Sequence, residues 1–117
     1  MTATGRRPQA WAVLELALAE RRAVRVRYHG EHRVVCPHAL GWKDSRAKVL
    51  AYQIAGTTSH GPLSPDPRQR WRSLFIDEID EIFLTDTDQV WGTADNYAPH
   101  RSNGIDMIEL AVPADGL

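Results

Sequence analysis

Cysteine, long apolar runs and paired metal ligands are all scarce in this 117-residue sequence. The single cysteine, Cys36, cannot form an intrachain disulfide, which fits a reducing compartment. The five histidines are scattered and show no ligand spacing, so we expect neither a metal nor a cofactor. No stretch approaches the roughly 18 apolar residues of a membrane span. The apolar stretch near the N-terminus is interrupted by Glu15 and is not a signal peptide. These absences indicate a soluble cytoplasmic protein of one domain.

Charge is present in both signs but is unevenly distributed. The formal net charge is −1, yet residues 1–48 hold ten Lys and Arg against four Asp and Glu. Residues 49–117 hold four Lys and Arg against eleven Asp and Glu. This asymmetry favours a face for nucleic acid or another anion. The alternative is that the acidic half lies against the basic half, within one chain or across a dimer.

Apolar periodicity predicts a mainly β fold behind one helix. The expected elements are a helix over 9–22, strands over 23–29, 33–36, 48–54 and 71–76, and a helical turn with a fifth short strand within 77–85. Pro37 should mark a strand end, an edge or a bend, because proline cannot donate to a ladder. A polar loop is expected over 42–47, and a longer loop over 56–70 that is either functional or disordered.

The chain after Asp86 is polar, with isolated aromatic anchors and a short alternating pattern over 108–112. That pattern predicts a last strand, with a short helix as the alternative. We therefore expect a small five-stranded β-barrel with its leading helix over 8–86. An extended C-terminal tail over 87–117 should pack on the barrel or on a partner.

The first expected strand carries the clearest candidate for a binding face. Val24, Val26 and Tyr28 alternate with Arg25, Arg27 and His29, so one face is apolar and the other is cationic. If Arg33, Lys48 and Arg72 join that cationic face, six basic groups line a groove. Such a groove would bind phosphates, and Trp42 or Trp71 could stack on bases. The alternative is a solvated face without a ligand.

Four motifs between Leu14 and Asp86 give the chain a familiar order. They are ALAERRAVRVRY, HRVVCPHALG, AKVLAYQIAG and WRSLFIDEI. In this order and spacing they resemble the WYL domain family. The resemblance implies a five-stranded Sm-like barrel with a helix across one end, in a small stand-alone bacterial member without a helix-turn-helix. It also implies a ligand-sensing role in transcription regulation, with nucleic acid or another anion bound on a basic face.

The sequence departs from that family at several positions. Lys48, Val49 and Leu50 stand where the family has its Trp-Tyr-Leu triplet, while Phe75 and Glu78 replace two arginines. Arg33 and Arg72 keep the family's basic character, with His38 beside them. The expected ligand-binding residues are therefore Arg25, Arg27, Arg33, His38, Lys48, Trp71 and Arg72.

Catalysis is not expected. Cys36 and His38 share a strand face, but a cysteine in an apolar strand usually packs as a small hydrophobic residue. The carboxylates over 77–81 fit a solvated edge better than a general acid–base set or a cation site. The expected function is non-enzymatic regulatory binding of single-stranded DNA or RNA, or of an anionic small molecule. The alternative is a protein-interaction module without a ligand, and a homodimer is expected because small barrels have free strand edges.

Overall fold

The structure is a computed structural model that describes residues 7–86, 89–99 and 104–113. Its elements are α1 (Ala10–Glu20), β1 (Val24–Tyr28), β2 (Glu31–Lys43), β3 (Arg46–Thr58), β4 (Gly61–Pro62), η1 (Pro67–Gln69), β5 (Trp71–Phe75), η2 (Ile76–Glu78), β6 (Ile79–Leu84) and β7 (Met107–Ala111). The expected mainly β fold with one N-terminal helix is thus confirmed.

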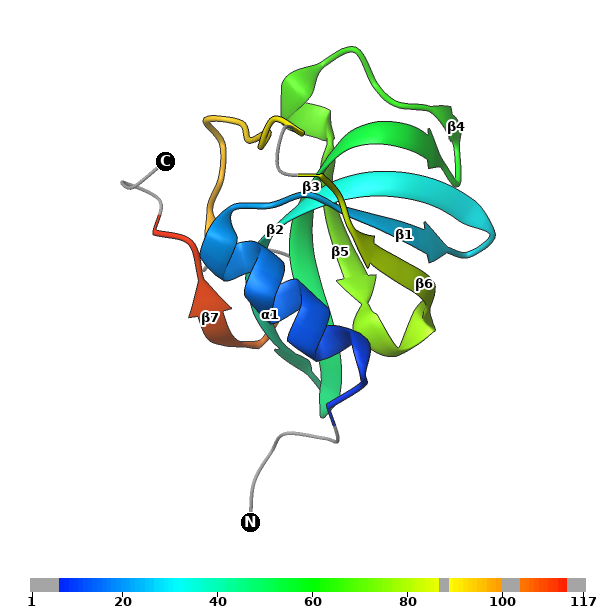
Figure 1. Cartoon of the computed structure of the whole chain (residues 1–117). Coiled ribbons are helices and arrows are strands. Elements are labelled where there is room, and N and C mark those ends of the chain that lie inside the picture. Colours follow the sequence, from blue (N-terminus) through cyan, green and yellow to red (C-terminus); the bar gives the residue numbers. More distant parts are fainter. Residues whose placement is uncertain (1–6, 87–88, 100–103, 114–117) are drawn as a thin grey trace.

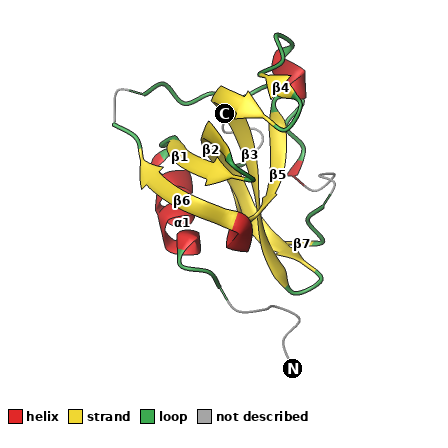
Figure 2. Cartoon of the chain, turned by 90° about the vertical axis from the view of Figure 1, so that its right-hand side faces the viewer, coloured by secondary structure: helices red, strands yellow, loops and turns green. Residues whose placement is uncertain are grey.

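The strands form one antiparallel sheet that curls into a half-barrel around α1 (Figures 1 and 2). The strand order is β4-β3-β2-β1-β6, while β5 pairs with β3 and β7 pairs with β2. Each of the two long strands pairs with three others along its length. Strand β2 pairs with β1, β3 and β7, and β3 pairs with β2, β4 and β5. The inner face of the sheet packs on Trp11, Leu14 and Ala17 of the helix. We call this concave side the inner face and the opposite side the outer face.

The local sequence explains the start of the fold. Arg21 ends α1 in the left-handed conformation, with φ 54°, and its guanidinium donates to the Leu18 carbonyl at 2.7 Å. This confirms the expected helix end. In β1, Val24, Val26 and Tyr28 are buried, which confirms the alternation expected from the sequence.

The hairpin of β2 and β3 differs from the expectation in two ways. The predicted loop over 42–47 is wrong, since Asp44 and Ser45 alone form the turn, with φ values of 50° and 67°. Two left-handed residues match the twist of a tight hairpin. The predicted extent of the second strand, 33–36, is also wrong, since β2 continues past Pro37 to Lys43. The ladder continues through a register shift between Pro37 and Ala39, which is how a strand accommodates a missing donor.

That register shift has a packing consequence. Before it, Val35 points to the inner core, and after it Leu40 and Trp42 do so. His38 and Ala39 consequently belong to the outer face.

The described parts of the C-terminal segment cover the outer face of β2, β3 and β5. Tyr97 and Ile105 pack on Ala39 and Leu50, and Trp91 packs near Tyr52. Strand β7 approaches β2 so closely that a Cβ on Gly41 would lie 2.2 Å from the Met107 carbonyl oxygen. Glycine is therefore required at that crossing.

Among the described residues, no helix has the length and apolar character needed to cross a membrane.

Candidate anion-binding site

A pocket opens at the end of the half-barrel where the β3–β4 hairpin and η1 lie, at the top of Figure 1. Its volume is about 390 Å³. We call it the mouth pocket, and its lining residues are Arg33, Thr58, Ser59, His60, Pro62, Ser64, Gln69 and Arg72. Two of the predicted ligand-binding residues, Arg33 and Arg72, meet here.

Strand register explains why these two arginines meet. Arg33 lies opposite Val26, and Arg72 lies opposite Ala51, and both partners belong to the inner core. Directly opposite residues of an antiparallel pair point to the same face. Both guanidinium groups therefore extend from the inner face toward the open end of the half-barrel.

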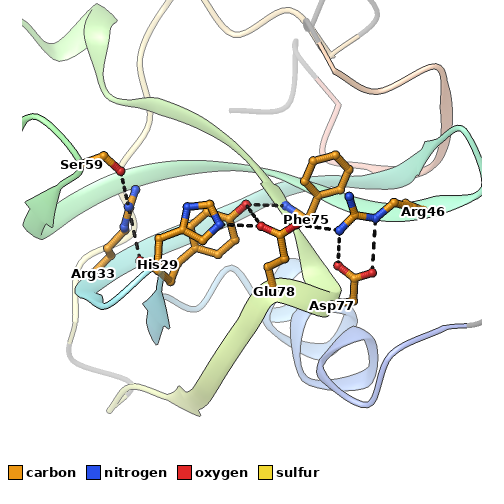
Figure 3. Close-up of polar contacts among 8 residues, drawn as sticks. His29, Arg33, Arg46, Ser59, Phe75, Asp77 and Glu78 are labelled. Carbon is orange, nitrogen blue, oxygen red and sulfur yellow. Dashed lines mark hydrogen bonds and ion pairs between the residues drawn. The ribbon is translucent and has the colours of Figure 1, made fainter.

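The guanidinium group of Arg33 has few hydrogen bonds for a buried cation. The residue is only 4% exposed, and its Nη2 makes two long contacts, 3.5 Å to the Tyr28 carbonyl and 3.4 Å to Ser59 Oγ (Figure 3). Its Nε is buried without an acceptor among the described residues. The guanidinium carbon lies 5.3 Å from the centroid of the Tyr28 ring, which adds a cation–π contact. Burial lowers the pKa of Arg33 below its usual value.

Arg72 is held firmly but keeps one end free. Its Nε donates to Gln53 Oε1 at 2.9 Å, and its Nη1 donates to the carbonyls of Gln69 and Trp71, each at 3.0 Å. Nη2 makes no hydrogen bond within the described part of the chain. Burial, and then the charge of Arg33, lower the pKa of Arg72. The two cations are thus close enough to repel each other.

Among the described residues, no carboxylate lines the mouth pocket. Glu31 raises the pKa of Arg33, although less than burial lowers it, and its carboxylate accepts a hydrogen bond from Thr57. Arg70 donates to the Ser64 carbonyl at 2.8 Å at the rim. Arg33, Arg70 and Arg72 form no ion pair with any described residue, so the surroundings of the pocket are cationic.

The structure does not bring Arg25 and Arg27 to this pocket. Arg25 lies opposite Val34 and Phe83 on the outer face, and the second hollow that it borders, with His32, shares only Arg33 with the mouth pocket. Arg27 is half exposed and lies 3.5 Å from Asp80 and 3.6 Å from Glu81. The expected groove of six basic groups is thereby divided between the two faces of the sheet.

Lys48 lies on the outer face at the other end of β3. It is buried, and its Nζ lies 4.2 Å from the centroid of the Phe75 ring. Burial, followed by the charges of Lys43 and Arg46, lowers its pKa. Five residues separate it from Gln53 along the strand, about 17 Å at 3.3 Å per residue. Lys48 therefore does not reach the mouth pocket.

His38 and Trp71 belong to a third place, an aromatic cluster of His38, Trp71, Trp91 and Tyr97 on the outer face. His38 is fully buried, with Nδ1 2.7 Å from the Cys36 carbonyl and Nε2 3.0 Å from Thr93 Oγ1. Burial lowers the pKa of His38 to about 4, so the ring is neutral at pH 7. The Trp71 Nε1 donates to Asn96 Oδ1 at 2.8 Å.

The groups considered for catalysis occupy structural positions. Burial raises the pKa of the Cys36 thiol to about 11, which removes the thiolate needed for nucleophilic attack. Asp77 and Glu78 each bond Arg46 at 2.7 Å, and Glu78 also contacts His29 at 2.5 Å (Figure 3). Within the described ranges, no group of three or more His, Cys, Asp or Glu side chains could hold a metal ion.

Sequence reasoning missed the polar wall of the mouth pocket. Ser59, His60 and Gln69 all fall in the stretch 56–70, which was expected to be either functional or disordered. Gln53 was missed as well, although it is a polar residue on the inner face between Ala51 and the strand end. It is fully buried and holds Arg72 in place, while its own amide donates to the carbonyls of Ala55 and Thr57.

No protein-family model matches the chain, and neither a curated protein nor a solved structure is significantly similar to it.

Proposed function

We propose that this protein is a non-enzymatic binding domain that holds an anionic ligand in the mouth pocket. The ligand classes are single-stranded DNA or RNA and anionic small molecules. The supporting observation is Arg33, a buried guanidinium with an unpartnered Nε beside a second arginine. Buried polar groups normally have hydrogen-bond partners, and an unpaired buried charge is costly. An anion in the pocket would balance the charge of Arg33, which forms no ion pair with any described residue.

The proposal includes a Sm-like barrel of the WYL type with a regulatory role in bacteria. Its support is the helix that leads into the successively paired strands β6, β1, β2, β3 and β5. Arg33 and Arg72, the two basic positions that the resemblance retains, are also the two that meet in the pocket. The role would be to sense a ligand rather than to transform one.

Fluorescence anisotropy with short labelled single-stranded DNA and RNA tests the proposal, together with thermal shifts in the presence of anionic metabolites. Binding should weaken steeply as salt rises. Arg33→Gln should weaken it strongly. Arg27→Gln is the matched control, because Arg27 is an arginine already paired outside the pocket. Absence of binding to every anion at low salt would contradict the proposal.

A second candidate function is self-association through β6. In the described part of the chain β6 pairs only with β1, and its Phe83 is 62% exposed. A free strand edge beside an exposed aromatic residue favours pairing with another chain. Light scattering should then give a mass above the 13.2 kDa of one chain, and Phe83→Ser should restore the monomer. A monomer at every concentration would count against this candidate.

A further inference from the structure

The mouth pocket has features that select among anions. We propose that it takes a terminal phosphate monoester, carried by a free nucleotide-like molecule or by the end of a nucleic-acid strand, and not an internal phosphodiester. This inference rests on the proposed function, because it specifies the ligand of the same pocket.

The shape of the pocket is the first argument. Gln53, which is fully buried, lies beneath Arg72, while the β3–β4 hairpin and η1 stand on either side. An internal phosphodiester has two chain substituents and needs a track that leaves in both directions. A neighbouring hollow contains Arg33 as well as Arg25, but Arg25 belongs to the outer face, so only Arg33 and Arg72 extend from the inner face toward the open end. A monoester has one substituent and fits a site entered from the open end.

Charge is the second argument. Arg33 and Arg72 line the pocket, Arg70 stands at the rim, and Glu31 is the carboxylate whose charge acts on Arg33. The local balance is therefore close to two positive charges. A phosphate monoester carries about −1.5 to −2 at pH 7, whereas a diester carries a single negative charge. Guanidinium groups also match phosphate oxygens with forked hydrogen bonds.

The count of free donors is the third argument. Arg33 Nε is buried without an acceptor, and neither Arg33 Nη1 nor Arg72 Nη2 bonds any described residue. A monoester presents three terminal oxygens to the two guanidinium groups, while a diester presents only two. The volume of about 390 Å³ lies within the roughly 300–1,000 Å³ of small-molecule sites, so a sugar-sized group fits beside the phosphate.

The test uses the full chain and one oligonucleotide sequence in three forms, with a 5′ phosphate, with a 3′ phosphate and with hydroxyls at both ends. We expect one phosphorylated form to bind at least about tenfold more tightly than the hydroxyl form. Arg72→Gln should remove this difference. A nucleoside monophosphate and its methyl ester, used as competitors at constant ionic strength, distinguish the two sources. Competition by the monophosphate points to a free metabolite, and its failure to compete points to a strand end.

A pH series on the unmodified protein provides a second measurement that does not depend on a variant folding. The second ionisation of a monoester lies near pH ~6, and arginines stay charged throughout. Affinity for the monophosphate should rise from about pH 5.5 to about pH 7.5. His60 also lines the pocket, so the methyl ester serves as the reference: the ratio of the two affinities should rise over this range, because changes in the protein act on both ligands.

Two results would overturn the inference, and they differ in what they leave standing. Equal affinity for phosphorylated and hydroxyl ends, still lost in Arg72→Gln, rejects the monoester but keeps anion binding at the pocket. Failure of every phosphate-bearing ligand to bind rejects both the inference and the proposed function. Circular dichroism of Arg72→Gln confirms that the variant is folded.

Discussion

The mouth pocket and the aromatic cluster both contain buried polar residues that the sequence placed in one binding site. In the aromatic cluster, both ring nitrogens of His38 have partners, and the ring is neutral at pH 7. In the mouth pocket, Arg33 keeps its charge, and its Nε has no acceptor in the described part of the chain. His38 and Arg33 are thus similarly buried, but the hydrogen-bonding groups of His38 are satisfied and those of Arg33 are not.

Whether a buried polar group has hydrogen-bond partners in its own chain distinguishes structural residues from candidate ligand-binding residues. A buried side chain whose partners come from its own chain contributes to stability, and its removal leaves those partners unpaired. A buried cation without partners costs stability in the free protein. Substitution in the aromatic cluster should therefore lower stability and leave anion affinity unchanged. Substitution of Arg33 should lower anion affinity and raise stability.

The largest effect is expected from pH acting on His38. The folded-state pKa is about 4, against about 6.5 for an unfolded histidine, so the unfolded state binds the extra proton first. Stability is fully present above about pH 6.5 and is lost as pH falls toward 4, by about 3 kcal/mol in all. Urea unfolding at several pH values measures this. His38→Gln should flatten the dependence in that window, and an unchanged slope would show that another group is responsible.

Next in size is the loss of affinity on substitution of Arg72. Arg72→Gln should weaken anion binding by about 100-fold, or about 2.7 kcal/mol, because charge-assisted hydrogen bonds are lost. Lys48→Gln removes the same charge from the far end of β3 and should change affinity by less than about twofold, since Lys48 lies about 17 Å along the strand from Gln53, roughly twice the Debye length of about 8 Å at physiological salt. Calorimetric titration of both variants makes the comparison. A large loss of affinity in Lys48→Gln would indicate that the anion binds on the outer face and not in the mouth pocket.

A smaller effect is expected in the aromatic cluster. The Tyr97 hydroxyl donates to the Val112 carbonyl at 2.7 Å and lies 3.2 Å from the His38 carbonyl. Tyr97→Phe should lower the free energy of unfolding by about 1–2 kcal/mol without changing anion affinity. Tyr52→Phe is the control, because the Tyr52 hydroxyl bonds no described residue, and its cost should stay within about 0.5 kcal/mol. Equal losses of stability in Tyr97→Phe and Tyr52→Phe would show that the hydrogen bonds of the Tyr97 hydroxyl do not stabilise the packing of the C-terminal segment.

The smallest effect has the opposite sign. Arg33→Met replaces an unsatisfied buried cation with an apolar chain and should raise the free energy of unfolding by about 1 kcal/mol while abolishing binding. The midpoint of urea unfolding at constant slope reports the change. Destabilisation on this substitution would place Arg33 with the residues that build the fold.

The fold was largely predictable because its main signals are local. The alternation over 23–29 located β1, and Arg21 marked the end of α1. The tight turn at Asp44 and Ser45 was not predicted, since neither residue is the glycine that usually adopts a left-handed conformation. The continuation of β2 past Pro37 depends on a bulge in its pairing with β3, and no local sequence pattern predicts that bulge.

The site was predictable only in part, because strand register decides which cations meet. The sequence singled out Arg33 and Arg72 among seven residues, but the others lie elsewhere. One register shift turns His38 outward, and the alternation of β1 and β2 directs Arg25 and Arg33 to opposite faces of the sheet. The polar wall comes from a stretch with no apolar period, where sequence patterns carry little information.

Helix α1 begins at the end of the molecule opposite the β3–β4 hairpin (Figure 1). A dye, an affinity handle or a solid support coupled ahead of Pro8 therefore stays clear of the mouth pocket. Immobilised in this way, the protein presents its open end to the solution. A label on the hairpin, at Ser59 or His60, would instead obstruct ligand entry and report binding directly through displacement.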